Sequence, residues 1–140
     1  MNIFFDVDQT ILGMDNSLRP GTREAMAGLI DGGHLVYVWS SVGIRKEAVK
    51  RHALEALVSG LYHKPQYDHV ERLTEMGVLA QPDFVVDDDP EVVNAFGGLW
   101  VPSYYMMSPE DREMGKVLRA VTQFASQGVC DDPNFKARRG

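Results

Sequence analysis

Charged and hydroxyl side chains follow several apolar runs of this sequence, and their types suit phosphate chemistry. Asp6 and Asp8 lie at the end of the run NIFFDVD, and the acidic triplet Asp87–Asp89 follows FVV. Ser40 ends the run LVYVWS, and Lys64 comes directly after GLYH. Carboxylates are oxygen ligands that Mg²⁺ prefers, whereas lysine and serine side chains donate hydrogen bonds to phosphate oxygens. Because an aspartate can also accept a phosphoryl group, these residues predict phosphoryl transfer at a magnesium site.

The chain alternates between apolar runs that predict strands and amphipathic segments that predict helices. We expect strands at residues 3–7, 35–40, 60–65, 82–90 and 97–105, and helices at residues 22–30, 45–58, 68–76 and 108–125. Strands that alternate with helices form a mostly parallel sheet with helices on both faces. The expected fold class is therefore α/β, a Rossmann-like three-layer sandwich. The carboxyl ends of its strands meet at one edge, so the side chains described above should converge there.

Four motifs in order make the sequence resemble the phosphatases of the haloacid dehalogenase (HAD) superfamily. DVDQT is similar to the first motif, D-x-D-x-T after a hydrophobic strand, and VYVWS to the second, a strand that ends in Ser or Thr. Lys64 in HKP matches the third motif, and the acidic residues of FVVDDDP match the fourth. The resemblance covers residues 3–94. Gln9 stands where the family often has glycine, and the second aspartate, Asp8, places the resemblance on the phosphatase side.

The resemblance implies a hydrolysis mechanism with two separate carboxylates. Asp6 would attack phosphorus and carry the phosphoryl group as an acyl phosphate. Asp8 would protonate the leaving oxygen and later deprotonate the attacking water. Ser40 would hold the phosphoryl oxygens, and Lys64 would offset the charge of the nucleophile and the phosphate. The expected activity is Mg²⁺-dependent hydrolysis of a phosphate monoester.

The resemblance also implies a Mg²⁺ site made of the Asp6 side chain, the Asp8 backbone carbonyl and the fourth motif. Counting from the end of the strand favours Asp87 and Asp88 as the metal-binding pair, with Asp89 as the cap of the next helix. Three polar residues within or close to the motifs are expected to bind substrate: Thr10, Ser41 and Arg45.

The segments between the motifs are short. Residues 11–34 hold a loop and one helix, and residues 41–63 hold one helix, which leaves no room for the cap domain of many HAD enzymes. Members without a cap act on large substrates or close the site by oligomerising. The loop ILGMDNSLRPG would lie beside the site. Its Asp15, Asn16 and Arg19 are either substrate contacts or, as we favour, ordinary turn residues.

Composition limits the partners and the location of the protein. The 140 residues carry a formal net charge of −6, so no overall basic field attracts nucleic acid. A local cluster of Arg45, Lys46, Lys50 and Arg51 is interpreted as a solvated helix face. No apolar run is long enough to span a bilayer, and we expect a cytoplasmic protein.

One HAD-like core domain is expected at residues 1–128, with a loosely ordered tail at residues 129–140. The apolar stretch at residues 100–107 is interpreted either as an exposed patch for self-association or as an edge strand and loop folded over the core, and with no cap domain we expect a homo-oligomer. The substrate stays open among nucleotides, sugar phosphates, phosphoproteins and nucleic-acid ends.

Two alternatives to a phosphatase use similar residues. Receiver domains of signalling systems also combine an acidic Mg²⁺ pocket, a phosphorylated Asp, a hydroxyl residue and a Lys, but in a different chain order. A HAD fold that only binds ligands is the other alternative, although every chemical group that catalysis needs is present in the sequence.

Overall fold

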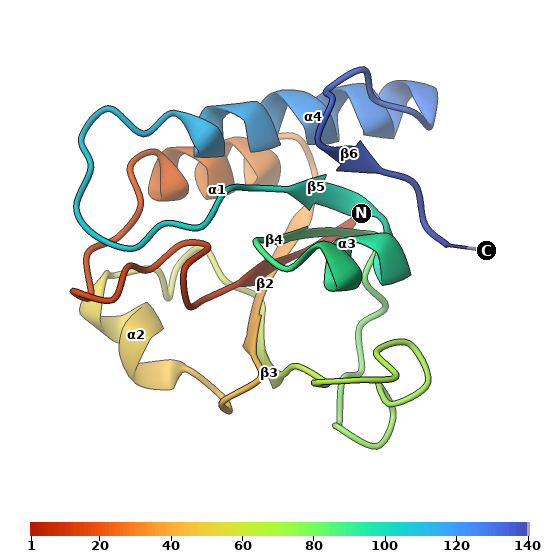
Figure 1. The fold of residues 1–140 in the computed structure, drawn as a ribbon, viewed down its shortest axis with the longest axis horizontal. Coiled ribbons are helices and arrows are strands. Elements are labelled where there is room, and N and C mark those ends of the chain that lie inside the picture. Colours follow the sequence, from red (N-terminus) through yellow and green to blue (C-terminus); the bar gives the residue numbers. More distant parts are fainter. Residues whose placement is uncertain (140) are drawn as a thin grey trace.

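Six strands and four helices make up the structure, a computed structural model that describes residues 1–139 (Figure 1). The elements are β1 (Asn2–Asp6), α1 (Thr22–Asp31), β2 (Leu35–Ser40), α2 (Lys46–Arg51), β3 (Gly60–His63), β4 (Phe84–Asp87), α3 (Pro90–Phe96), β5 (Gly98–Trp100), α4 (Glu113–Gln127) and β6 (Phe135–Lys136). The strands form one sheet in the order β3-β2-β1-β4-β5-β6. All neighbouring strands are parallel except β6, which is antiparallel to β5. The predicted α/β class with a mostly parallel sheet is confirmed.

The strand register brings the ends of β1 and β4 together. Ile3 on β1 lies opposite Phe84 on β4, and Phe5 lies opposite Val86. Asp6 and Asp87, the next residue of each strand, therefore leave the sheet side by side. On the other side of β1, β2 carries Ser40 to the same edge.

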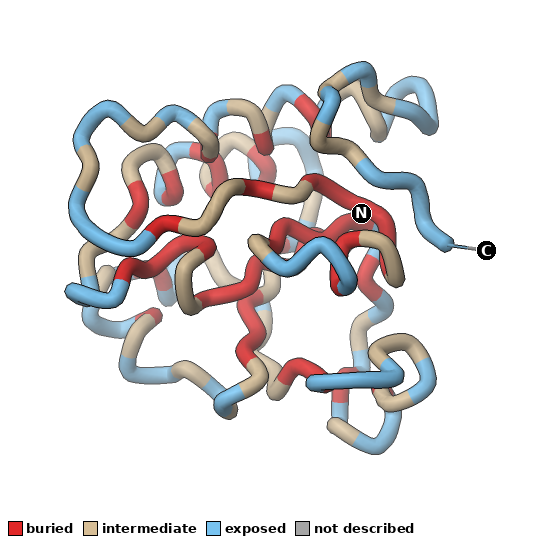
Figure 2. Tube along the Cα trace, in the orientation of Figure 1, coloured by how far each residue is buried: buried red, intermediate tan, exposed pale blue. Residues whose placement is uncertain are grey.

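Two apolar cores lie on the sheet because successive side chains of each strand point to opposite faces. Phe5 belongs to one core, which also contains the buried residues of α1 and α4, and these two helices lie side by side in Figure 1. Phe4 belongs to the other core, which it shares with Trp39 and with Val93 and Phe96 of α3. Burial on both sides explains why β1 and β4 are almost continuously apolar, and Figure 2 shows the strands as the buried centre of the molecule.

Of the expected helices, the one at residues 68–76 is missing and the one at residues 45–58 is shorter than predicted. Residues 68–76 form a series of turns instead of a helix, and Asp68 has a positive φ of 46°. Leu73 of this segment still packs on the sheet. The helical spacing of its apolar residues therefore indicates burial, although no helix forms. The helix expected at residues 45–58 ends at Arg51 because Ala53 turns the chain with a φ of 54°, and Leu54 then enters the core.

The last helix begins later than predicted. The sequence predicts a helix from residue 108, but α4 begins at Glu113 and Ser108 lies in the loop before it. Asp111 lies close to the true beginning, where its carboxylate accepts the backbone N–H of Glu113. The same carboxylate binds Arg19, so a tertiary contact fixes the place where the helix can begin.

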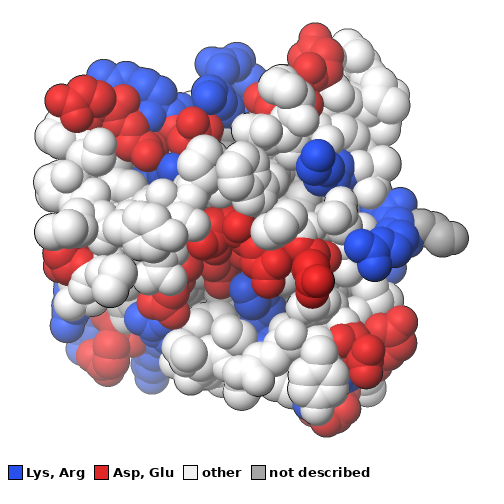
Figure 3. Space-filling model, in the orientation of Figure 1, with Lys and Arg blue, Asp and Glu red and all other residues white. Residues whose placement is uncertain are grey.

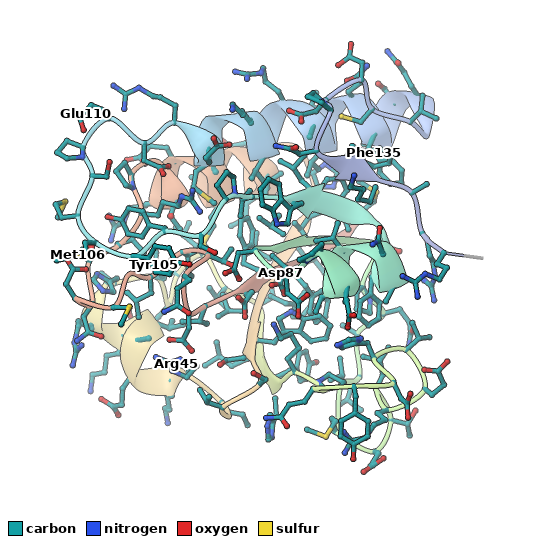
Figure 4. All side chains as sticks on the ribbon, viewed as in Figure 1. Arg45, Asp87, Tyr105, Met106, Glu110 and Phe135 are labelled. Carbon is teal, nitrogen blue, oxygen red and sulfur yellow. The ribbon has the colours of Figure 1, made fainter. Side chains whose placement is uncertain are left out.

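The C-terminal segment joins the sheet, in contrast to the loosely ordered tail expected at residues 129–140. β6 pairs with β5, and the ring of Phe135 lies 6.3 Å from that of Phe84 and 5.5 Å from that of Phe124. Figure 4 shows the labelled Phe135 beside α4. These aromatic contacts make residues 135–136 part of the core domain.

Only a loop and α1 separate β1 from β2, and only α2 with its flanking turns separates β2 from β3. These segments match the short connections expected from the sequence. Within residues 1–139, no helix combines the length and the apolar character needed to cross a membrane.

Candidate active site

A buried lysine links two carboxylates at the carboxyl edge of the sheet. The ammonium of Lys64 donates hydrogen bonds to Asp6 Oδ1 and Asp87 Oδ2, each at 2.9 Å. All three side chains are at least nine-tenths buried. In Figure 4 the labelled Asp87 lies near the centre of the view, and Figure 3 shows acidic atoms gathered at the same place.

The charges of this cluster do not balance. Burial raises the pKa of Asp87 well above its ordinary value, and repulsion by Asp6 raises it further, whereas attraction by Lys64 lowers it. Burial also raises the pKa of Asp6. For Lys64, burial opposes the charged form, but attraction by Asp87 and Asp6 outweighs it and the pKa lies above its ordinary value. One ammonium thus serves two buried carboxylates, and a further cation would stabilise their ionised forms.

Asp88 adds a third carboxylate at the open side of the cluster. The hydroxyl of Thr10 lies 2.9 Å from Asp6 Oδ2 and 3.2 Å from Asp88 Oδ1, and it accepts the backbone N–H of Asp88. Ser103 donates to Asp88 Oδ2 at 2.8 Å, and the indole of Trp100 donates to the Asp88 carbonyl at 2.9 Å. Thr10, expected to bind substrate, is fully buried and orients carboxylates here. Its contact with substrate stays a prediction.

The three carboxylates of this cluster can share a metal ion. One oxygen from each of Asp6, Asp87 and Asp88 lies within 4.8 Å of the others. Mg²⁺ binds oxygen at about 2.0–2.1 Å, so its ligands lie roughly 3 to 4 Å apart, and a small closure of the cluster would satisfy it. Hard oxygen donors and the shortage of positive charge both fit this ion. The expected cap is confirmed, because Asp89 accepts the N–H of Glu91 at the start of α3.

The side chain of Asp8 lies apart from the other carboxylates. Its Oδ2 accepts a hydrogen bond from Ser40 Oγ at 3.4 Å and forms an ion pair with the guanidinium of Arg45. The metal contact expected through the backbone carbonyl of Asp8 stays a prediction. Ser41, expected to bind substrate, is half-buried, and its carbonyl accepts a hydrogen bond from His63 at 3.0 Å.

The loop after β1 contains a residue whose role the sequence did not reveal. Arg19 is 1% exposed, and its guanidinium binds both oxygens of Asp111 at 2.9 and 3.0 Å. It also donates to the carbonyl of Thr10 at 3.1 Å and lies over the ring of Tyr104. Arg19 is therefore buried and holds the loop that carries Thr10.

Ser103 and Trp100 were also missed as parts of the site. Both come from the end of β5 and the loop after it, which the sequence presents as an ordinary apolar strand. The order of strands puts β5 next to β4, and this neighbour relationship has no local signal in the sequence. Asp15 and Asn16 behave as turn residues, since Asp15 accepts hydrogen bonds from Ser17 and from the backbone of Met107.

Comparison with known proteins shows similarity in fold alone. No protein-family model matches the chain, and no curated protein matches it. A chain in a solved crystal structure is similar to it with a TM-score of 0.50 and 13% sequence identity, over 91% of this chain and 84% of the other. At this identity the likeness concerns the arrangement of strands and helices and says nothing about the chemistry of the site.

Proposed function

We propose that this protein is a Mg²⁺-dependent phosphatase of the HAD type, which hydrolyses a phosphate monoester through an aspartyl-phosphate. The observation that carries the proposal is the cluster of Asp6, Asp87 and Asp88 around the buried ammonium of Lys64. The separate position of Asp8 supports it further. Apolar cores on both faces of a sheet of order β3-β2-β1-β4-β5-β6 support a Rossmann-like three-layer sandwich, the fold that the proposal requires.

The first half of the reaction transfers the phosphoryl group to the protein. An oxygen of Asp6 attacks phosphorus, the bond from phosphorus to the leaving oxygen breaks, and Asp8 gives that oxygen a proton. Lys64 holds the attacking carboxylate in place through its 2.9 Å hydrogen bond. Bound Mg²⁺ would supply positive charge that offsets repulsion between the carboxylates and the phosphate.

The second half returns the protein to its starting state. Asp8 accepts a proton from a water molecule, whose oxygen attacks phosphorus as the bond to Asp6 breaks. Asp8 can serve as acid and then as base because it ends the first half without its proton. Ser40 lies 3.4 Å from Asp8, and in this proposal its hydroxyl leaves that contact and donates to a phosphoryl oxygen.

Turnover of a simple aryl phosphate tests the proposal. We expect product release in the presence of Mg²⁺ and its loss when a chelator removes the ion. Activity that survives excess chelator would contradict the site described here. A single round of phosphorylation without turnover would instead favour the receiver-like alternative.

Self-association stays a prediction. In the stretch 100–107, Val101 and Tyr104 are buried, whereas Tyr105, Met106 and Met107 are more than half exposed. The exposed half, together with the exposed Met14, supplies the apolar surface from which a dimer was expected. Light scattering at high micromolar concentration would detect the dimer, and a strictly monomeric mass would exclude it.

A further inference from the structure

An open groove lies along α2 and the loop after β1. It has a volume of about 430 Å³, and its lining includes three cationic side chains, Arg45, Lys46 and Arg51. Glu47 is the acidic side chain of the lining, and Asn16 borders the groove from the loop after β1. Figure 3 shows basic and acidic atoms interspersed over the region where Figure 1 places α2. The lining therefore carries an excess of positive charge on a protein whose net charge is −6.

Arg45 connects this groove to the reacting groups. Its guanidinium forms the ion pair with Asp8, and its side chain is 24% exposed. In Figure 4 the labelled Arg45 lies beside α2, on the side of this helix toward the labelled Asp87. An anion bound in the groove would thus lie next to the carboxylate that serves the leaving oxygen.

We infer that the substrate carries a second phosphate group and that Arg45, Lys46 and Arg51 bind it in this groove. The inference rests on the proposed phosphatase function and narrows its substrate class. Arginine binds phosphate through two parallel hydrogen bonds, and lysine adds a point charge. The basic cluster that the sequence presents as a solvated helix face is in this account a binding surface.

The second phosphate also affects the chemistry at Asp8. Arg45 forms an ion pair with Asp8 Oδ2 in this structure. A carboxylate oxygen that is paired with a guanidinium is less available to give a proton to the leaving oxygen. A phosphate in the groove competes for the guanidinium and releases that oxygen. The second phosphate should therefore raise kcat as well as lower KM.

Matched nucleotides test the inference. We would measure kcat/KM for a nucleoside 3′,5′-bisphosphate, for the two corresponding monophosphates, and for an oligonucleotide with a terminal phosphate. Hydrogen bonds to charged groups predict a preference of about 10- to 100-fold for the bisphosphate over the better monophosphate. A stronger preference for the oligonucleotide would identify a polynucleotide as the source of the second phosphate. Equal kcat/KM for all four compounds would overturn the inference while leaving the phosphatase proposal intact.

Variants of α2 locate the effect. The double variant Lys46→Ala/Arg51→Ala should bring the ratio of bisphosphate to monophosphate kcat/KM close to one. Lys50→Ala is the matched control, because Lys50 is an exposed cation of the same helix outside the groove lining. It should retain the preference of the unmodified protein. An equal loss in both variants would point to general attraction and would contradict the assigned groove.

Binding gives a readout that does not need turnover. Calorimetry with Asp6→Asn protein should show tighter binding of the bisphosphate than of either monophosphate, and the Lys46→Ala/Arg51→Ala change should remove the difference. If no phosphate ester is turned over, the proposed function fails. The binding comparison still tests whether the groove binds the second phosphate. Identical binding of all three compounds would overturn the inference.

Discussion

The side-chain hydroxyl of Thr10 holds the backbone of Asp88. The hydroxyl of Thr10 accepts the backbone N–H of Asp88 at 3.1 Å and lies 3.2 Å from Asp88 Oδ1. The first residue follows β1 and the second follows β4, so a single buried hydroxyl joins the two strand ends that carry the carboxylates. The hydroxyl is also 2.9 Å from Asp6, which makes it the shared partner of two proposed metal ligands.

Thr10→Val should therefore weaken Mg²⁺ binding and destabilise the protein. Valine has nearly the same shape but leaves the Asp88 N–H and the carboxylate oxygens without their partner, at a cost of about 1–3 kcal/mol. A thermal melt and a Mg²⁺ titration measure the two effects. Thr10→Ser is the control, because it keeps the hydroxyl and should preserve metal affinity. Equal affinity in the valine variant would show that the hydroxyl has no part in ordering the site.

Asp6→Asn and Asp8→Asn should both fold but lose activity for different reasons. An amide at position 6 cannot act as nucleophile, so turnover should vanish for every substrate. An amide at position 8 removes an acid and base whose assistance is typically worth about 10²–10⁴-fold. The Asp8 variant should lose more activity with alkyl phosphates than with aryl phosphates, whose leaving oxygen needs less help. Near-normal turnover by a folded Asp6→Asn protein would exclude the covalent mechanism.

The metal-free protein should lose stability as the pH rises. Burial raises the pKa of Asp87 in the folded protein above its ordinary value of 3.8. At pH values between 3.8 and this raised pKa, the folded state binds a proton that the unfolded state has released. Unfolding free energy therefore falls with increasing pH across this window. The raised pKa of Lys64 adds no slope there, because its contribution is lost only above its ordinary value of 10.5. Chemical denaturation in chelator at a series of pH values measures the slope.

Asp87→Asn is the matching control for this pH dependence. The amide keeps the size of the side chain but cannot ionise, so the part of the slope that comes from Asp87 should disappear and the part that comes from the raised pKa of Asp6 should remain. Saturating Mg²⁺ should reduce the slope of the unmodified protein as well, since the ion binds the ionised carboxylates. A stability that is flat with pH in the unmodified, metal-free protein would refute the assignment.

Arg19→Met should be among the more destabilising substitutions outside the carboxylate cluster. Arg19 is buried with Asp111 in a two-point ion pair, and the loss of one partner leaves a half-buried charge, at a cost of about 3 kcal/mol. Asp111→Asn should cost a similar amount, because it leaves the buried guanidinium of Arg19 without its counter-charge. Urea unfolding of both variants and of the double variant gives the coupling between the two residues. Independent, additive effects would show that the pair contributes nothing to stability.

The sequence predicted the elements that are defined by local pattern. β1, β2 and β4 are almost continuously apolar and end in polar residues, so their type and the convergence of Asp6 and Asp87 followed from this pattern and the rule for parallel sheets. The strand expected at residues 82–90 is shorter in the structure, where β4 spans Phe84–Asp87. α1 was likewise predicted to within a residue, because Gly32 and Gly33 end it. These features depend on neighbours in the chain.

The features that the sequence did not reveal depend on contacts between distant segments. Residues 68–76 carry helical spacing, yet the turn at Asp68 and packing of Leu73 on the sheet override it. α4 begins at Glu113 because Asp111 is held by Arg19, which lies on a loop 92 residues earlier. No local pattern distinguishes that arginine from an exposed turn residue.

The order of the strands has a consequence for how the protein is made. β1 precedes the other five strands in the chain but lies inside the sheet, where Ile3 pairs with Val36 on β2 and Phe84 on β4. Asp6 can contact Lys64 and Asp87 only after those later segments of the chain have been made and have folded onto β1. Long-range parallel pairings of this kind form slowly, because loop closure precedes the contacts that compensate for it. The carboxylate cluster should accordingly be among the last parts to form, and recovery of metal binding after dilution from denaturant would time the final step of folding.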